Sequence, residues 1–415
     1  MSLWRHPDFR KLWAGQTVSE IGSRITRDGI PITAVMLLHA TPWQMGILAS
    51  LTGIAALSAG TIAGAAADRL PRRGILIVSD LGRAFVLAMV PLAAMAGLLS
   101  LGQLYAVIFA AGILTIFFDV AYQSYLPSLV APSELLEGNG KLALSTATAE
   151  VLGPGITGIL VQTLTAPRAI LLDSLSFLVS AASILLIRVR EPHPAAPVRA
   201  SGPHPAAGFR YLAGNPILRA LFLRSATFAL FIGFLSTLYV FYAIDELRLS
   251  PWLYGIVVAL GGVGNFVGAS LSDRMVRRVP LGRLLVGCTL WNGVINFLIP
   301  LAHGSPVLAA VFLGAAQLLG DAAYPIYSVH ELTLRQQMVP PEILGRVNAA
   351  MQLAFKGLWP VGALVGGALG STLGTRPTMF LCAGGVLLSA VWLIASPVAG
   401  LREYPEDALS RARSA

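Results

Sequence analysis

The sequence predicts an all-α protein that crosses a membrane many times, and three observations carry this prediction. Only 12% of the 415 residues are charged, 55% are hydrophobic, and the mean hydropathy is +0.73. A soluble chain of this length has about a quarter of its residues charged. A globule of this size cannot bury so much apolar surface, so lipid must solvate part of it.

The apolar residues fall into twelve runs that are long enough, or nearly so, to cross about 30 Å of hydrocarbon as helices. No basic segment with a short apolar run and a small-residue cleavage site precedes the first run, so we expect no cleaved signal. Cys288 and Cys382 lie in apolar runs, which favours core packing over a disulfide or a metal pair. The twelve expected spans are residues 12–38, 43–66, 75–99, 103–128, 142–164, 168–188, 215–243, 251–271, 283–301, 306–331, 347–371 and 376–398.

The positive charges predict how the chain is oriented. With the N-terminus placed inside the cell, 23 of the 29 Lys and Arg residues fall at or near the inner side. Three fall outside and three within spans. Lys and Arg gather on the cytoplasmic side of membrane proteins, so we expect both termini in the cytoplasm. The net charge of +9 is then explained by the orientation of the chain in the membrane. We therefore expect no nucleic-acid partner.

Residues 189–209 are rich in Pro, Ala and Arg and interrupt the apolar pattern after the sixth run. Such a stretch is typical of a linker, and its two histidines, His193 and His204, are not taken as a metal site. We predict an N-terminal six-helix bundle at 1–188, a cytoplasmic linker at 189–214, a C-terminal six-helix bundle at 215–398 and a cytoplasmic tail at 399–415.

The two predicted bundles repeat each other. Four motif pairs recur in the same order at offsets of 202 to 209 residues, which indicates an internal duplication with parallel halves. This is the architecture of a transporter with a site near the midplane between the halves. The pairs are 68-DRLPRRG-74 with 273-DRMVRRV-279, 119-DVAYQSYLP-127 with 321-DAAYPIYSV-329, 131-APSELLEGN-139 with 339-VPPEILGRVN-348, and Gly153-Pro154-Gly155 with Trp359-Pro360-Val361-Gly362.

With these motifs the chain resembles the major facilitator superfamily over essentially its whole length. The strongest signature, 64-GAAADRLPRR-73, is similar to the family's loop 2–3 motif, except that Pro71 stands where the family usually has a second Gly. Its counterpart 269-ASLSDRMVRR-278 lacks the leading Gly. The segments 7–25, 118–139 and 341–350 resemble bacterial exporters of the enterobactin and macrolide-efflux subgroup. The resemblance implies the major facilitator fold, with twelve transmembrane helices in two pseudo-symmetric six-helix bundles, in the bacterial inner membrane.

The resemblance also implies a conformational gate at the loop motifs. Asp68 closes the second span, where its carboxylate can cap the N-terminus of a neighbouring helix. In the family that neighbour is the eleventh span, so the contact would hold the halves together when the cytoplasmic side is shut. The arginines either pair with acids across the same seam or only follow the positive-inside rule. The gate residues are Gly64, Asp68, Arg69, Arg72 and Arg73, with Asp273 and Arg274 in the second motif.

The fifth span carries a glycine-proline motif made of Gly153, Pro154, Gly155 and Gly158. Small residues let helices approach closely, and proline removes a backbone donor and permits a bend. The motif is similar to one found in superfamily exporters, which favours export over import, although such packing is common in any membrane helix.

The first span holds four ionisable residues, Glu20, Arg24, Arg27 and Asp28. Without residues 19–28 the apolar remainder is too short to cross the membrane. On a helical wheel the four share a face about 100° wide, with opposite charges at i,i+4. Four lone charges would cost on the order of 10–14 kcal/mol. We therefore expect a paired stripe on a hydrated cavity, which lines the cargo path, carries protons, or only joins this span to its neighbours.

Six further residues complete the predicted cargo and ion path. The motif pairs put Glu150 and Lys356 at equivalent places, where they could pair across the cavity when one side closes. Arginine neighbours favour the charged forms of Glu20 and Asp28, so Glu150 or Asp119 is the preferred proton carrier. The six are Asp119, Tyr122, Glu150, Asp321, Tyr324 and Lys356, and Asp173 near the outer end of the sixth span is a further candidate. Asp119 and Asp321 either face the cavity or only hydrogen-bond to groups that do.

We predict a secondary active transporter, a proton-coupled exporter of an amphipathic drug, macrolide or siderophore, working as a monomer by alternating access. Sodium coupling, import, lipid flipping and a non-transporting membrane protein stay open as alternatives. No phosphate-binding loop points to ATP, and the glycines of 261-GGVGNFVGAS-270 suit helix packing. No nucleophile–base set or metal spacing stands out, so we expect no enzyme, catalytic residue, metal or cofactor.

Overall fold

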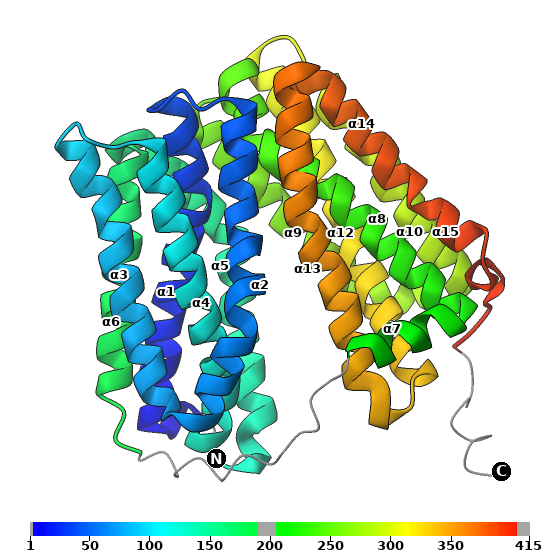
Figure 1. Ribbon diagram of the computed structural model, residues 1–415, viewed down its shortest axis with the longest axis horizontal. Coiled ribbons are helices and arrows are strands. Elements are labelled where there is room, and N and C mark those ends of the chain that lie inside the picture. Colours follow the sequence, from blue (N-terminus) through cyan, green and yellow to red (C-terminus); the bar gives the residue numbers. More distant parts are fainter. Residues whose placement is uncertain (1–2, 190–204, 405–415) are drawn as a thin grey trace. The chain divides into compact units, whose positions relative to one another are not determined.

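The computed structural model describes residues 3–189 and 205–404, and within these ranges it is helical without any strand. Figure 1 shows the helices in order along the chain. Their bounds are α1 Pro7–Met36, α2 Pro42–Arg69, α3 Arg72–Met95, α4 Leu101–Leu129, α5 Leu135–Leu164, α6 Ala166–Leu185, α7 Pro205–Gly214, α8 Pro216–Phe241, α9 Pro251–Val276, α10 Leu281–Asn296, α11 Leu298–Leu301, α12 Pro306–Met338, α13 Pro341–Thr372, α14 Thr375–Leu388 and α15 Ala390–Ile394, with short turns η1 Leu3–Arg5, η2 Pro132–Glu134, η3 Tyr242–Glu246 and η4 Pro397–Gly400.

The predicted membrane-crossing pattern is confirmed. Eleven segments of the described chain are helical, long and apolar enough to cross a membrane. The remaining predicted span is α1, whose 30 residues are also long enough but include the charged stretch from Glu20 to Asp28. The twelve-helix prediction therefore agrees with the structure once this charged helix is counted.

Two predicted spans are each divided into a longer and a shorter helix. The run 283–301 becomes α10 and α11, and the run 376–398 becomes α14 and α15. Side chains at both breaks bond to the backbone of the preceding turn. Asn296 donates to the Asn292 carbonyl at 2.7 Å, and Ser389 donates to the Val386 carbonyl at 2.6 Å. Similar bonds also occur within unbroken helices, for example from Thr33 to the Gly29 carbonyl, and a hydropathy profile does not report where a run is divided.

By its contacts the chain separates into two compact units, which we call unit 1 (Met1–Arg199 with Ala243–Ala259) and unit 2 (Ala200–Tyr242 with Leu260–Ala415). In unit 1, α1 packs on α5 and α6, α2 on α4, and α3 on α4 and α6. In unit 2, α8 packs on α13 and α14, and α10 on α12.

The predicted domain limits stay predictions, because much of the predicted linker and tail, including His193 and His204, lies outside the described residues. Residues Pro205–Gly214, at the end of the predicted linker, form α7, which packs on α13 and α8.

Two faces of α1 are used differently. Gly15, Gly22 and Gly29 recur every seven residues and face α6. A Cβ at Gly22 would lie 2.6 Å from Asp173 Oδ1, and one at Gly15 would lie 2.7 Å from Ser183 Cβ. Only glycine permits this approach, so the two helices are in close contact along their length. The charged stripe from Glu20 to Asp28 occupies the opposite face of α1.

The glycine run of α9 packs against α12, as predicted. A Cβ at Gly264 would overlap the Leu318 carbonyl, and one at Gly268 the Ala322 carbonyl. Cys288 and Cys382 are buried free thiols, in agreement with the core packing expected of them.

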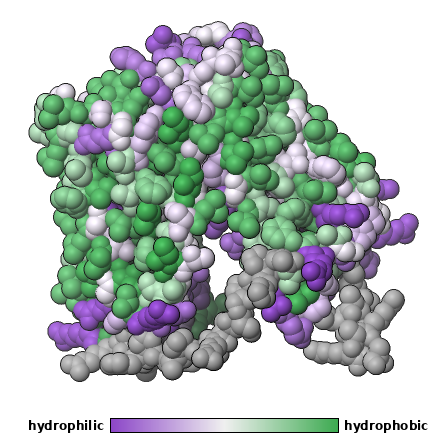
Figure 2. All heavy atoms as spheres, viewed as in Figure 1, coloured by the Kyte–Doolittle hydropathy of each residue, from purple (hydrophilic) through white to green (hydrophobic). Residues whose placement is uncertain are grey.

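Large apolar side chains are exposed along the helix flanks. Phe85 of α3 and Phe266 of α9 are each 69% exposed. Figure 2 shows hydrophobic residues over the flanks of the helices and hydrophilic residues mainly near their ends. Such a surface is suited to lipid, which solvates apolar groups between two polar boundaries.

Candidate functional site

The charged face of α1 forms an ion pair with α5. Arg24 Nη2 lies 2.9 Å from Glu150 Oε1. The Glu150 side chain is 48% exposed, whereas that of Arg24 is 15% exposed. We expected Arg24 to pair along its own helix with Glu20 and Asp28. Among the described residues its ion pair is instead with Glu150, because the long arginine side chain reaches a neighbouring helix that the sequence alone does not place.

Gly153 of α5 makes room for this ion pair. A Cβ at Gly153 would lie 2.7 Å from both Cβ and Cγ of Arg24. A side chain at this position would therefore displace Arg24 or move the helices apart. The glycine-proline motif and the charged stripe, which were recognised separately, meet at this contact.

The other motif residues have different surroundings. A Cβ at Gly158 would lie 2.7 Å from the Pro251 carbonyl oxygen and 3.1 Å from Gly255 Cα, both at the start of α9 within unit 1. A Cβ at Gly155 would meet nothing within 4 Å. Pro154 is buried inside α5, which continues through it. Close packing is thus seen at Gly153 and Gly158 but not at Gly155.

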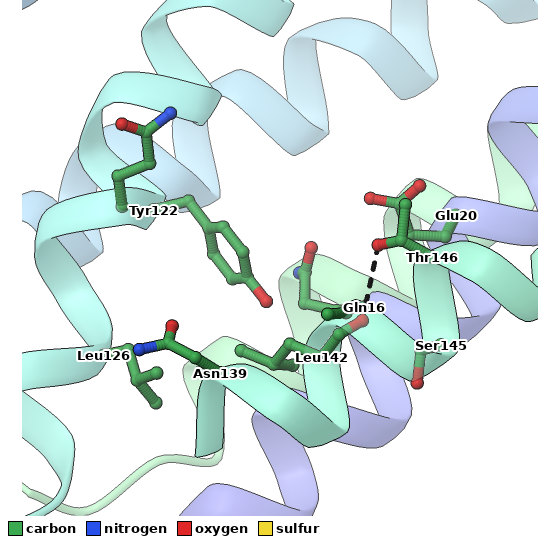
Figure 3. A pocket seen from close by; sticks show the side chains of 10 residues that line it. Gln16, Glu20, Tyr122, Leu126, Asn139, Leu142, Ser145 and Thr146 are labelled. Atoms are coloured by element: carbon green, nitrogen blue, oxygen red, sulfur yellow. Dashed lines mark hydrogen bonds between the residues drawn. The ribbon is translucent and has the colours of Figure 1, made fainter. Parts of the chain in front are cut away.

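A pocket of about 210 Å³ with a mixed polar and apolar lining lies beside the charged face of α1, between α1, α4 and α5 (Figure 3). Figure 3 shows the ring of Tyr122 pointing into the pocket, with Gln16 and Asn139 on the neighbouring helices. Glu20 lines the same pocket. Its lining combines amide, hydroxyl and carboxylate groups with aliphatic walls, from Gln16, Glu20, Tyr122, Gln123, Leu126, Asn139, Leu142, Ala143, Ser145 and Thr146.

Two pocket residues are positioned by contacts with residues that do not line the pocket. The Tyr122 ring stacks on Phe118 with centroids 5.6 Å apart. The Gln16 amide donates to Ser180 Oγ on α6 at 2.8 Å. These contacts restrict the side chains without using the Tyr122 hydroxyl, so the pocket presents ordered polar groups to a ligand.

The remaining predicted path residues divide between the units. In unit 1, Arg27 and Asp119 are exposed and Asp28 is partly buried. In unit 2, Asp321 packs against Gly261, where a Cβ would overlap its carboxylate, and both Tyr324 and Lys356 are exposed. A pair between Glu150 and Lys356 would join the two units and stays a prediction.

Two arginines of the loop motif in unit 1 bind backbone carbonyls of neighbouring helices. Arg72 donates to the Ser124 carbonyl at 3.0 Å, and Arg73 donates to the Leu185 carbonyl at 2.7 Å. These carbonyls lie near the C-terminal ends of α4 and α6, where a positive charge is favourable. Both arginines therefore have a structural role inside unit 1.

The other residues of the predicted gate are less closely packed than these two arginines. Asp68 and Arg69 are exposed at the end of α2, and a Cβ at Gly64 would meet nothing within 4 Å. Asp273 and Arg274 are likewise exposed at the end of α9. An exposed carboxylate at a helix end remains free to serve as a cap elsewhere.

Two arginines that were counted with the inner-side charges, Arg83 and Arg224, are buried among helices. Arg83 of α3 is 5% exposed, forms a salt bridge with the fully buried Asp80, and lies between the rings of Phe118 and Phe177 at 4.2 and 4.1 Å. Arg224 of α8 is also 5% exposed and lies 3.7 Å from the Tyr327 ring centroid. The sequence could have indicated the Asp80–Arg83 pair, because two residues of opposite charge stand three positions apart within an apolar run.

Asp173 lies in the packing between α6 and α1 rather than in the pocket. It is fully buried, accepts from Ser176 Oγ at 3.0 Å, and faces Gly22. Within the described ranges, no group of three or more His, Cys, Asp and Glu residues is arranged to hold a metal ion.

Asp8, before the apolar part of α1, joins the two ends of the six-helix segment. It accepts from Lys11 Nζ at 2.6 Å and from the backbone amides of Arg188 and Val189 at 3.0 Å each. Burial acts to raise the pKa of Asp8, but these hydrogen bonds outweigh it and lower the pKa below its usual range. The carboxylate thus stays charged and holds the chain end in place.

Comparisons with known proteins agree with the helical arrangement. A family profile described as Major Facilitator Superfamily matches residues 12–358. The chain is 23% identical over 402 residues to the uncharacterized MFS-type transporter YfiS of Bacillus subtilis strain 168, covering 95% of this chain and 94% of that one. It is 24% identical over 382 residues to the enterobactin exporter EntS of Citrobacter koseri, covering 89% of this chain and 84% of the exporter.

Solved structures show the same fold at lower identity. The nucleoside transporter NupG superposes with a TM-score of 0.78 at 12% identity, covering 94% of this chain and 98% of its own. A bacterial homologue of the iron transporter ferroportin, in an inward-facing state, superposes with a TM-score of 0.72 at 21% identity, covering 95% and 99%.

Proposed function

Because the chain belongs to the major facilitator superfamily of membrane transporters, we propose that it exports an amphipathic small molecule across the bacterial inner membrane in exchange for protons. The two six-helix bundles would alternate the access of one site between the two sides of the membrane. The Arg24–Glu150 ion pair carries the proton coupling in this proposal, and the similarity to an enterobactin exporter supports the direction.

Arginine neighbours count against Glu20 and Asp28 as proton carriers, and the structure gives Glu150 an arginine partner as well, so this proposal requires the pair to open during transport. Water can reach the Glu150 carboxylate, which is 48% exposed, whereas Arg24 is held against Gly153 on α5. Protonation of Glu150 would remove the charge that Arg24 pairs with, and would leave the guanidinium ready for a polar group of the cargo. Proton entry releases about 2.3 kcal/mol per 100 mV of membrane potential, which can drive uphill export.

The pocket beside this pair supports a cargo with both polar and apolar surface. Glu20, Gln16 and Tyr122 offer hydrogen-bonding groups, and Leu126 and Leu142 offer aliphatic contact. Drugs, macrolides and siderophores all have this mixed chemistry. The similarity to an enterobactin exporter, at 24% identity, supports the siderophore class as one member of this range.

The orientation and the gate belong to the same proposal. The bias of Lys and Arg residues supports cytoplasmic termini, and it persists when Arg83 and Arg224 are removed from the count. The helix α13 begins at Pro341 without a side-chain cap from its preceding residue, Pro340. The first backbone amides of α13 therefore have no side-chain acceptor at the preceding residue. In this proposal the Asp68 carboxylate accepts from these amides when the cytoplasmic side closes.

The proposal is tested with Glu150→Gln and a matched control, Glu137→Gln. Both residues lie on α5 in an ion pair, with Glu137 3.1 Å from Lys141 and its side chain 39% exposed. The proteins are expressed in a pump-deficient bacterial host and challenged with dyes, macrolides and siderophores. Proton movement is followed in vesicles. We expect Glu150→Gln to lower export at least tenfold and Glu137→Gln to leave it within about twofold.

Four results would contradict the proposal at different points. Equal protection by both variants would remove Glu150 as the proton carrier. Accumulation of a labelled compound inside the cells would indicate an importer, and movement of labelled lipid between leaflets would indicate a flippase. The absence of cargo-dependent proton flux in proteoliposomes would favour sodium coupling or a non-transporting protein. Replacing sodium with another cation would separate these two, because only a sodium-coupled transporter would lose its cargo transport.

A further inference from the structure

A strongly basic pocket lies at the end of unit 2 where α9 ends and α10 begins. Its volume is about 610 Å³, and it is formed by the α9–α10 loop and by the chain that follows η4. Four arginines and one carboxylate give it a net positive charge, while aliphatic residues form part of its wall. The charged lining residues are Arg277, Arg278, Arg283, Arg402 and Glu403, and the apolar ones include Val276, Val279, Pro280 and Leu401.

The wall that carries Arg402 is held in place by the backbone. The amides of Gly282 and Leu281 donate to the carbonyls of Leu401 and Arg402 at 2.8 and 3.1 Å. A Cβ at Gly282 would overlap the carbonyl oxygen of Val398, a residue whose side chain is fully buried. The glycine therefore permits the close approach that brings Arg402 beside the start of α10.

The same segment is anchored a second time beyond the pocket. The Tyr404 hydroxyl is hydrogen-bonded to Nδ1 of His330, and Nε2 of that buried histidine lies 3.1 Å from Ser272 Oγ on α9. Arg402 and Glu403 are thus fixed on both sides along the chain. The pocket is a formed feature of unit 2 and does not depend on how the side chains at its rim happen to lie.

The four arginines are available to a ligand. Each is exposed, and among the residues that the structure describes none has a carboxylate within 4 Å. The positive-inside rule explains positive charge at this end of the helices. It does not require four arginines from two separate segments to surround one cavity. Guanidinium groups bind phosphate oxygens in a forked, two-bond geometry, so such a cluster selects phosphate.

The position of the pocket indicates where the phosphate comes from. Both α9 and the α10–α11 segment are among the membrane-crossing helices, so the loop between them lies at the level of lipid headgroups. Aliphatic wall residues such as Val279 and Leu401 suit the glycerol and first methylene groups of a lipid. We propose that this pocket binds the phosphate of an anionic phospholipid headgroup. The proposal does not depend on the cargo, the ion or the direction of transport.

The test measures binding of water-soluble short-chain lipids to the full-length protein in a neutral detergent. The probes are dioctanoyl phosphatidylglycerol, the zwitterionic dioctanoyl phosphatidylcholine, and glycerol phosphate with inorganic phosphate as free anions. The variant is Arg277→Gln with Arg278→Gln. Its control is Arg210→Gln with Arg219→Gln, which removes the same charge from two exposed arginines of α7 and α8 that do not line the pocket.

We expect phosphatidylglycerol to bind the unchanged protein and the control with dissociation constants within about twofold of each other. Since the pocket variant loses two of the four guanidinium groups that would bind the phosphate oxygens, it should bind at least tenfold more weakly. Arg277→Lys with Arg278→Lys keeps the charge but loses the forked geometry, and should fall between the two.

Each other outcome overturns part of the proposal. Equal weakening by the pocket and control variants would show that net charge alone attracts the lipid. Equal binding of phosphatidylcholine would remove the preference for an anionic headgroup. Binding of glycerol phosphate as tight as that of phosphatidylglycerol would assign the pocket to a soluble phosphorylated molecule. Elution of every variant as one sharp size-exclusion peak confirms that the comparison is made on folded protein.

Discussion

Two arginine–carboxylate pairs among the described helices of unit 1 have opposite surroundings. Arg83 and Asp80 are sealed, with side chains 6% and 0% exposed and two aromatic rings over the guanidinium. Arg24 and Glu150 are open on the carboxylate side, where Glu150 is 48% exposed. A sealed pair can hardly exchange protons or ligands, because water does not reach it. The same two residue types thus serve structure in one place and suit ion coupling in the other.

The largest effect on stability is expected at the sealed pair. Arg83→Met alone leaves the buried carboxylate of Asp80 without its partner, which should cost about 3–5 kcal/mol. Arg83→Met together with Asp80→Leu removes both charges and should recover most of this loss. Unfolding in detergent, followed by circular dichroism, measures both variants. A single variant as stable as the unchanged protein would show that the pair does not hold unit 1 together.

An intermediate effect is expected where α5 meets α1. Gly153→Ala places a Cβ 2.7 Å from two Arg24 side-chain atoms, so overpacking should cost about 1–3 kcal/mol and lower transport through the displaced Arg24. Gly155→Ala is the matched control on the same helix, because a Cβ there meets nothing within 4 Å. It should be neutral or slightly stabilising. Equal melting temperatures for the two variants would contradict the packing role of Gly153.

The open pair should show a small effect on stability and a large one on activity. Glu150→Gln removes a half-exposed ion pair, which is worth less than about 1 kcal/mol, while export falls as described above. A melting temperature lowered as much as by Arg83→Met would mean that the open pair is structural after all, and the comparison between the two pairs would fail.

The smallest effect is expected outside the membrane, at Asp8. Because the pKa of its carboxyl is lowered in the folded protein, its contribution is fully present above the ordinary aspartate pKa and is lost as the pH falls through the lowered value. Asp8→Asn removes this contribution. The melting temperatures of the two proteins should therefore differ at neutral pH and converge below about pH 4. A difference that grows as the pH falls would contradict the sign.

Much of the fold could be predicted because apolar run length is a property of consecutive residues. The order of the helices, the charged first span and the packing role of the α9 glycines all follow from local patterns, whereas α12 as their partner came from the structure. The breaks before α11 and α15 could not be predicted, because the length of an apolar run does not report where a helix is interrupted within it.

Composition, run length and the repeated motifs were enough to recognise a multi-pass membrane protein of a transporter family and to identify the charged residues within its spans. Which of these residues are partners became clear only from the folded helices. Arg24 was expected to pair along α1 but reaches Glu150 on α5, and Arg83 was counted near a loop but is buried between aromatic rings. The physical reason is reach: hydropathy and helical period act over one or two turns, whereas a long charged side chain selects its partner from helices that only folding brings together.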